Sequence, residues 1–149
     1  MPMDPEATVR AWNDAILRHD IDGCLSLMSD DYARYGDPSW DKPMTKDEWG
    51  EALKTFCAAF PDWGWEITNL FVFGDTVILE ASERGSWTKP WELFGSTLEP
   101  SGETFADQDA VFFVVKDGLI THTRVYITNN FSRVFKVEEK MAELLTDQG

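Results

Sequence analysis

Apolar residues recur at helical spacing near the start of the chain. Val9, Trp12 and Ile16 follow one another at intervals of three and four positions, and Pro5 stands where a first helical turn would begin. Such spacing places the three apolar side chains on one helical face, and we therefore predict a helix over residues 6–18. A second, shorter helix is predicted next, with its cap and apolar positions at Asp22, Leu25 and Met28.

The clearest helix signal begins at Thr45. Thr45 and Glu48 have the spacing of a capping box, in which two side chains each satisfy a backbone N–H at the start of a helix. Pro61 ends the segment, because proline cannot continue a helix. The apolar positions between these limits are Trp49, Leu53, Phe56 and Phe60.

Beyond Pro61 the apolar period changes from helical to alternating. Alternation predicts long strands at residues 65–73, 76–87, 104–115 and 119–128, after a brief strand at residues 32–35. Glycine-containing turns join the first long pair and the last long pair. A final short helix is predicted from Val137, Met141 and Leu144. Helices followed by consecutive hairpins indicate a single α+β domain over residues 1–149 with a mostly antiparallel sheet.

Composition and charge narrow the classes of partner. The 13 basic and 27 acidic side chains give a formal net charge of -14. Such a chain repels phosphate backbones and anionic membrane surfaces, so we expect neither a nucleic-acid nor a membrane partner. The seven tryptophans and ten phenylalanines exceed what a core of this size needs. That excess indicates an aromatic-lined cavity, a buried dimer face, or both.

The two cysteines and two histidines do not form a metal-binding pattern. Cys24 and Cys57 lack the spacing of zinc ligands and are interpreted as small buried side chains. His19 and His122 fall on unrelated elements, and the chain has no glycine-rich phosphate loop, so we expect neither a metal nor a cofactor. The first five residues lack the basic and apolar segments of a secretory signal, and we expect a reducing cytoplasm.

Three short stretches, taken with the order of the elements, carry a resemblance to a known superfamily. They are Phe60-Pro61-Asp62, Gly74-Asp75 before a strand that ends in Gly85, and Asp117-Gly118-Leu119-Ile120. From about residue 6 to residue 128 the chain resembles the nuclear transport factor 2-like superfamily, and within it the SnoaL-like, polyketide cyclase-like branch. The resemblance implies a cone-shaped, curved sheet that encloses a pocket with the N-terminal helices, as in cystatin-like rolls. It also implies a homodimer through the outer sheet face.

Several activities share this fold, so the fold alone does not select one of them. They include polyketide cyclases, ketosteroid isomerases, limonene epoxide hydrolases, scytalone dehydratases and non-catalytic binding proteins. In SnoaL-like cyclases an acidic residue near the end of the last strand serves as general acid/base, and Thr128 occupies that position here. A threonine hydroxyl is not an effective acid or base near neutral pH.

If Thr128 faces the pocket, alternation brings Tyr126, Arg124 and His122 to the same face. The neighbouring strand would then contribute Asp107, Asp109, Val111 and Phe113. His122, Asp109 and Glu83 are the candidate catalytic residues, because the ordinary pKa of a histidine lies near neutral pH and carboxylates beside it could orient it or act as bases. Arg124 would pair with Asp109, bind an anionic group, or cover apolar surface with its stem.

The remaining candidates are aromatic. The predicted ligand-binding residues are Arg124, Tyr126, Thr128, Trp12, Tyr35, Trp49, Phe56, Trp63 and Trp87. Trp87, Trp91 and Phe94 surround Pro90 in a looser segment, which we expect to form a lid or a dimer surface.

Two functions fit these residues. The first is a cofactor-independent isomerase, cyclase or dehydratase acting on a small apolar, aromatic or polycyclic molecule. Asp109 or His122 would take a proton from carbon, and Tyr126 or Arg124 would stabilise the enolate oxygen. The second is a module of the same fold that binds a small molecule or a protein without catalysis. Convergence of His122, Asp109 and Glu83 on an open cavity would favour the first function, and a filled interior would favour the second.

Overall fold

The computed structural model describes residues 3–36, 40–93 and 95–128, together with residues 136, 139 and 143. Residues 3–128 contain three helices, α1 (Pro5–Leu17), α2 (Ile21–Leu25) and α3 (Lys46–Ala59). The strands are β1 (Met28–Tyr35), β2 (Met44–Thr45), β3 (Gly64–Phe73), β4 (Thr76–Ser86), β5 (Trp91–Leu93), β6 (Ser96–Leu98), β7 (Thr104–Lys116) and β8 (Leu119–Ile127). The predicted α+β class is confirmed.

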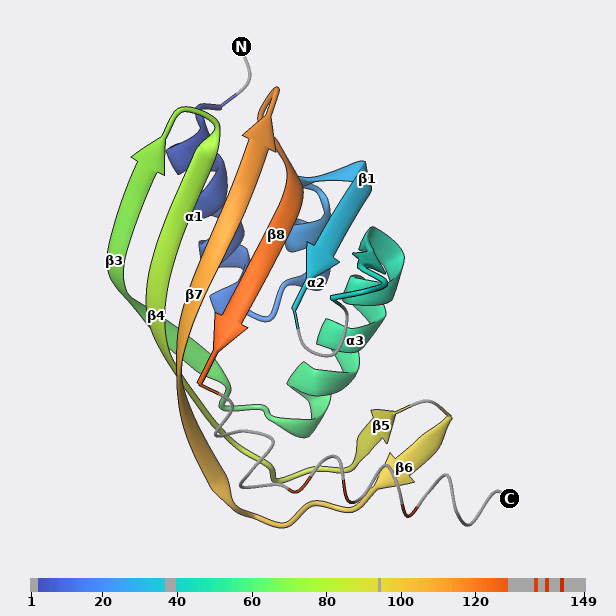
Figure 1. Cartoon of the computed structure of the whole chain (residues 1–149). Helices are drawn as coiled ribbons and strands as arrows, with labels where there is room; N and C mark the ends of the chain where they lie inside the picture. Colours follow the sequence, from blue (N-terminus) through green and yellow to red (C-terminus); the bar gives the residue numbers. More distant parts are fainter. Residues whose placement is uncertain are drawn as a thin grey trace.

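Six strands form one curved sheet in the order β2-β1-β8-β7-β4-β3. Neighbouring strands are antiparallel except β1 and β8, which run parallel. The hairpins β3–β4 and β7–β8 turn at Gly74 and Gly118, whose positive φ angles favour glycine. Figure 1 shows the helices gathered on one side of the sheet. We call that side the concave face and the opposite side the convex face.

The helix starts follow their caps. Thr45 caps α3, and the capping box is complete, because the Glu48 N–H donates to Thr45 Oγ1 and the Thr45 N–H donates to Glu48 Oε1. The cap predicted for the second helix is wrong. Asp20 caps α2, because its carboxylate reaches the Gly23 N–H at 2.9 Å. That helix ends at Leu25, and Met28 begins β1 instead. The segment predicted from Val137, Met141 and Leu144 lies outside the described residues.

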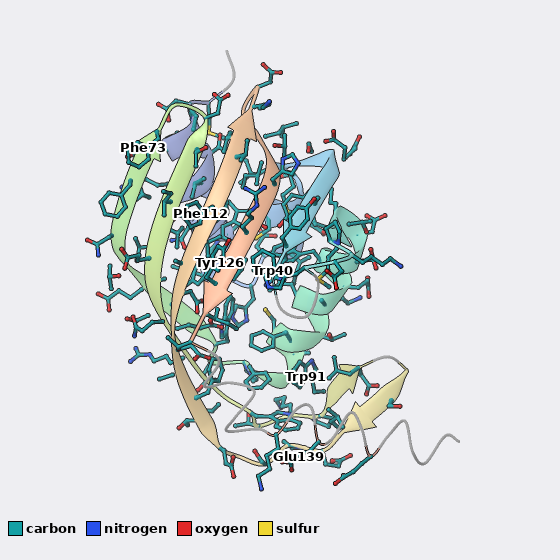
Figure 2. The ribbon with its side chains drawn as sticks, in the orientation of Figure 1. Trp40, Phe73, Trp91, Phe112, Tyr126 and Glu139 are labelled. Carbon is teal, nitrogen blue, oxygen red and sulfur yellow. The ribbon has the colours of Figure 1, made fainter. Side chains whose placement is uncertain are left out.

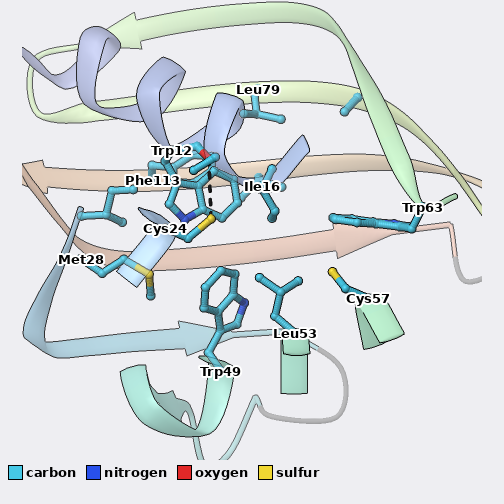
Figure 3. Close-up of a cluster of buried hydrophobic side chains, with 14 of the residues drawn as sticks. Trp12, Ile16, Cys24, Met28, Trp49, Leu53, Cys57, Trp63, Leu79 and Phe113 are labelled. Atoms are coloured by element: carbon cyan, nitrogen blue, oxygen red, sulfur yellow. Dashed lines mark hydrogen bonds between the residues drawn. The ribbon is translucent and has the colours of Figure 1, made fainter. Parts of the chain in front are cut away.

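Aromatic rings from three layers meet in the core. The Trp12 ring of α1 lies 5.9 Å from that of Trp49 on α3, 6.0 Å from Trp65 on β3 and 5.1 Å from Phe113 on β7. Figure 3 shows Trp12, Trp49 and Phe113 in this arrangement. The Cys24 thiol donates to the Trp12 carbonyl oxygen at 3.8 Å. These contacts join α1, α2 and α3 to the sheet.

A second aromatic cluster closes the end of the core near β5. Phe60 contacts Trp87, Trp91 and Phe105 with ring centroids 5.6 to 6.1 Å apart. The prediction of a lid or dimer surface is therefore wrong for Trp87 and Trp91, which are both buried. Their segment is not a free loop, since the Thr88 and Lys89 N–H groups both donate to the Ala59 carbonyl oxygen at the end of α3. Phe94 lies outside the described residues.

The two thiols share this buried environment. Burial raises the pKa of Cys24 to about 12 and that of Cys57 to about 11, so both thiols stay protonated and unreactive at neutral pH. Both cysteines are free. Within the described ranges, no helix has the length and apolar character needed to cross a membrane.

Candidate functional site

The register of β8 decides which of its side chains reach the concave face. Ile120 and Thr123 are buried, whereas His122, Arg124 and Tyr126 are exposed. The prediction that these three exposed residues face the pocket is wrong. Thr128 was the anchor of that prediction, but β8 ends at Ile127, so the alternation does not extend to Thr128.

The three outward residues contact convex-face neighbours. His122 Nδ1 lies 2.9 Å from Thr121 Oγ1, and the Arg124 guanidinium lies 5.7 Å from the centre of the Tyr35 ring. Tyr126 packs against Phe112 and Trp40, which Figure 2 labels beside it on the sheet. These contacts replace the predicted pairing of Asp109 with His122 or Arg124. They also place Tyr35, a predicted ligand-binding residue, on the convex face.

Thr128, just beyond β8, forms two hydrogen bonds that the sequence did not predict. Its hydroxyl donates to Asp107 Oδ1 at 2.6 Å and accepts the Gln108 N–H at 3.1 Å. Asp107 is almost completely buried. Thr128 therefore secures the start of the β7–β8 pairing and helps satisfy a buried carboxylate.

The predicted inward face of β7 is confirmed, and with it the position of Asp109. In the β4–β7 pairing, Asp109 lies opposite Ala81 and Asp107 lies opposite Glu83. The three acidic side chains are therefore neighbours on the concave face. Asp109 and Glu83 form a side-chain hydrogen bond. Glu83 Oε1 also accepts the indole N–H of Trp63 at 2.7 Å. Two of the three predicted catalytic residues thus converge, while His122 does not.

Asp109 is held in its protonated form. Burial, reinforced by the hydrogen bond and the negative charge of Glu83, raises the pKa of Asp109 to about 10. The neutral Asp109 carboxyl can therefore donate to the Glu83 carboxylate at neutral pH. Asp109 Oδ1 is buried and has no hydrogen-bond partner within the described part of the chain. A buried polar atom without a partner is costly, and such atoms are often found where a ligand binds.

Arg34 lies close to this acidic pair and was missed by the sequence analysis. It pairs with Thr123 across β1 and β8, and Thr123 is on the concave face. Burial lowers the pKa of Arg34. Electrostatic interactions with Tyr32, Glu83 and Asp109 raise this pKa and offset part of the lowering. The sequence could have indicated its direction, because Arg34 follows Tyr32 by two residues and alternate side chains of a strand share a face.

Tyr32 and Thr123 complete the polar part of the concave face. Their hydroxyls lie 2.5 Å apart in a buried position. Burial raises the pKa of Tyr32 to about 12, so its hydroxyl remains protonated. This pair links β1 to β8 beside Arg34.

The predicted aromatic ligand-binding residues of the concave side are packed against one another. Trp12, Trp49, Trp63 and Trp87 are each at most 8% exposed. Phe56 is half-buried and stacks on Phe60 with ring centroids 4.5 Å apart. Of this set, Trp63 has direct contact with the acidic pair, through Glu83.

Two of the surface hollows formed by the described residues are not lined by this aromatic set. A hollow of about 290 Å³ is lined mainly by convex-face residues near the end of β8, including Glu80, Gln108 and Tyr126. Asp109 also lines it. The other, of about 540 Å³, lies between α2 and α3. Among the residues that the structure describes, no group of three His, Cys, Asp or Glu side chains is arranged to hold a metal ion.

The family of the chain follows from its sequence. The model of the SnoaL-like domain matches residues 9–123, most of the chain, and the protein belongs to this family. The resemblance inferred from the three short stretches is therefore confirmed. None of the curated proteins compared with the chain matches it.

Solved structures share the fold at low sequence identity. AclR of Streptomyces galilaeus, a candidate hydroxylase, is similar with a TM-score of 0.74 and 19% identity over 89% of this chain and 96% of that one. IdmH of Streptomyces antibioticus, a candidate polyketide cyclase, has a TM-score of 0.69 and 22% identity over 85% and 94%. A Catenulispora acidiphila protein with a ketosteroid isomerase-like fold, solved with trimethylamine, has a TM-score of 0.64 and 20% identity over 83% and 86%.

Proposed function

We propose that this SnoaL-like protein binds a small, mostly apolar molecule on the concave face and transfers a proton at one of its carbon atoms. The supporting observation is the hydrogen-bonded pair of Asp109 and Glu83 beside the aromatic core. Isomerisation, aldol-type cyclisation and dehydration each use such a proton transfer, and two carboxyl groups suffice for it. The reaction takes place in the cytoplasm, where the two free thiols stay reduced.

The protonation state of the Asp109–Glu83 pair suits this proton transfer. At neutral pH it holds one shared proton and one negative charge, as in other sites where adjacent carboxyl groups cannot both ionise. The carbon–hydrogen bond of the substrate breaks, its proton passes to Asp109 Oδ1, and its electron pair forms the enolate. The shared proton moves to Glu83 at the same time. The reverse transfer at a different carbon returns a proton and restores the pair.

The experiment measures exchange of carbon-bound hydrogen. A panel of cyclic ketones (cyclohexanone, 1-indanone and 2-tetralone) is incubated with the protein in D₂O, and loss of the proton signals next to the carbonyl is followed by NMR. We expect exchange above the buffer rate, lowered about 10² to 10⁴-fold by Asp109→Asn. His122→Ala, on the convex face, is the matched control and should leave the rate unchanged. Equal rates with and without protein across the panel would contradict catalysis.

A non-catalytic binding module is the second candidate. The packing of Trp12, Trp49 and Trp63 against one another supports it, since rings that fill the interior leave less room for a reacting molecule. Binding of the same ketones, detected by saturation-transfer NMR without exchange, is the result that this function predicts.

We also propose that the protein forms a homodimer through the convex face. Phe71, Phe73 and Tyr126 are 45%, 66% and 49% exposed on that face, and Figure 2 labels two of them there. Large exposed apolar side chains grouped on one face are typical of an interface. Sedimentation at micromolar concentration should show a dimer that Phe71→Ser weakens. A monomer for the unmodified protein would contradict this proposal.

A further inference from the structure

Arg34 forms no ion pair with another described residue, although Glu83 and Asp109 lie near enough to raise its pKa electrostatically. None of the ion pairs formed by the described residues includes Arg34, nor does any of their side-chain hydrogen bonds. Its residue is neither fully buried nor fully exposed, while its guanidinium has lost much of its water. Desolvating a guanidinium is costly unless an anion compensates for the lost water. The arrangement is therefore incomplete without an anionic group.

The neighbouring carboxylates are already occupied by other donors. Glu83 accepts the Trp63 N–H and hydrogen-bonds with Asp109. Asp107 accepts the Thr128 hydroxyl. Asp109 is neutral when protonated. Among the described residues, none of these acidic groups hydrogen-bonds or ion-pairs with Arg34, so the N–H donors of the guanidinium are open to a ligand.

A second unpartnered group lies on the same face. Asp109 is 5% exposed, and its Oδ1 has no hydrogen-bond partner among the described residues. Electrostatic interaction connects Asp109 with Arg34. A guanidinium without an ion pair and a carboxyl oxygen without a partner among the described residues, both on the concave face, mark a binding site for a molecule that carries an anionic end.

The position of the guanidinium favours a small anionic group. A Cβ atom added at Gly36 would lie 3.3 Å from Arg34 Nη1 and 3.2 Å from the Val125 carbonyl oxygen. Gly36 thus allows the guanidinium to lie against the end of β8. A single planar fork of donors matches the two oxygens of a carboxylate.

We propose that Arg34 binds the carboxylate of the small apolar ligand and thereby directs that ligand toward Asp109 Oδ1. This inference rests on the proposed function in so far as the ligand occupies the same concave face. It adds the class of ligand: an apolar or aromatic molecule with one carboxylate. Arg34 is a binding and positioning residue in this arrangement, and the Asp109–Glu83 pair remains the acid/base group.

The test compares a carboxylate with its neutral analogue. Binding of 2-naphthoate and 2-naphthamide to the full-length protein is measured by calorimetry. We expect 2-naphthoate to bind at least about tenfold more tightly, because the amide lacks the charge that the guanidinium recognises. Arg34→Met should remove this preference by weakening 2-naphthoate and leaving 2-naphthamide unchanged. Arg34→Lys should retain only part of the preference, since lysine lacks the planar fork.

Arg124→Met is the matched control, because Arg124 is an arginine of the adjoining strand on the opposite face. It should leave both affinities unchanged. Equal binding of the two naphthalenes, an unaltered preference in Arg34→Met, or loss of the preference in Arg124→Met would each overturn the assignment. Failure of 2-naphthoate to bind would overturn it as well.

The outcomes separate this inference from the proposed function. If the cyclic ketones exchange hydrogen in an Asp109-dependent way and 2-naphthoate shows no preference, the carboxylate assignment fails and the acid/base function stands. If 2-naphthoate binds through Arg34 and no ketone exchanges, the ligand site stands and catalysis fails. Thermal denaturation of Arg34→Met serves as a folding control, and Arg34→Lys repeats the test if the methionine variant is unfolded.

Discussion

The two faces of the same sheet carry different chemistry. On the concave face, Val111 and Phe113 of β7 are buried and Asp109 is held neutral beside Glu83. On the convex face, Phe112 contacts Tyr126, and Arg124 covers the Tyr35 ring. Adjacent residues of one strand therefore differ in burial because alternate side chains point to opposite faces.

The difference shows that residue type alone did not locate the site. His122, Arg124 and Tyr126 look suited to catalysis, yet they lie in solvent on the convex face. A charged side chain on that face keeps its contact with water. A carboxyl group on the concave face loses water, and its pKa rises accordingly.

The largest expected effect is a difference in stability between a substitution in the core on the concave side and one on the convex face. Trp12→Ala removes a ring that touches Trp49, Trp65 and Phe113, and it should lower the free energy of unfolding by about 3 to 5 kcal/mol. Phe73→Ala, on the convex face, should cost less than about 0.5 kcal/mol in the monomer. Urea denaturation of dilute protein measures both changes. Equal losses would show that the convex face is also packed.

A smaller effect is expected from the buried hydroxyl pair of the concave face. Thr123→Val keeps the side-chain shape but leaves the Tyr32 hydroxyl without its partner, which should cost about 1 to 3 kcal/mol. Thr76→Val is the matched control, since Thr76 is in a row of the sheet that faces outward, paired with Val114. Urea denaturation should find the control nearly unchanged, and a neutral Thr123→Val would mean that the hydroxyl pair adds no stability.

The pH dependence of stability reports on Asp109. Between its ordinary pKa of 3.8 and its raised pKa of about 10, the folded protein holds a proton on Asp109 that the unfolded chain releases. The contribution of Asp109 therefore destabilises the fold as pH rises through this window, by up to about 1.4 kcal/mol per pH unit. Asp109→Asn should remove this slope. Unfolding measured at pH 5, 7 and 9 would contradict the assignment if wild type and variant changed in parallel.

The smallest effect is expected for His122→Ala. His122 is exposed and contacts Thr121, so its removal should change the free energy of unfolding by less than about 0.5 kcal/mol. Thermal or urea denaturation at pH 6 and pH 8 measures the change. A loss above 1 kcal/mol at either pH would show that the convex face holds His122 more firmly than its exposure implies.

Much of the architecture was predictable because it depends on local signals. The spacing of Thr45 and Glu48 predicted the start of α3, and the alternation of residues 76–87 predicted the strand β4. The inward direction of Asp109 was also predicted. These features follow from caps and periodicities, which the chain carries within a few residues.

The remaining features depend on contacts between distant segments. The register of β8 against β7 pairs His122, Arg124 and Tyr126 with the outward row of β7, opposite to the predicted face. The hydrogen bond of Thr128 to Asp107 joins residues 21 positions apart, so no local sequence pattern predicts it.

The sequence by itself determined the family, the order of helices and strands, and the presence of acidic residues on one face of β4 and β7. Only the tertiary structure joined Asp109 to Glu83, set Arg34 beside them and buried Trp87 and Trp91. The physical reason is that burial and pairing arise when separate strands come together. Until then, a carboxyl group and a guanidinium keep the hydration and the pKa of an exposed side chain.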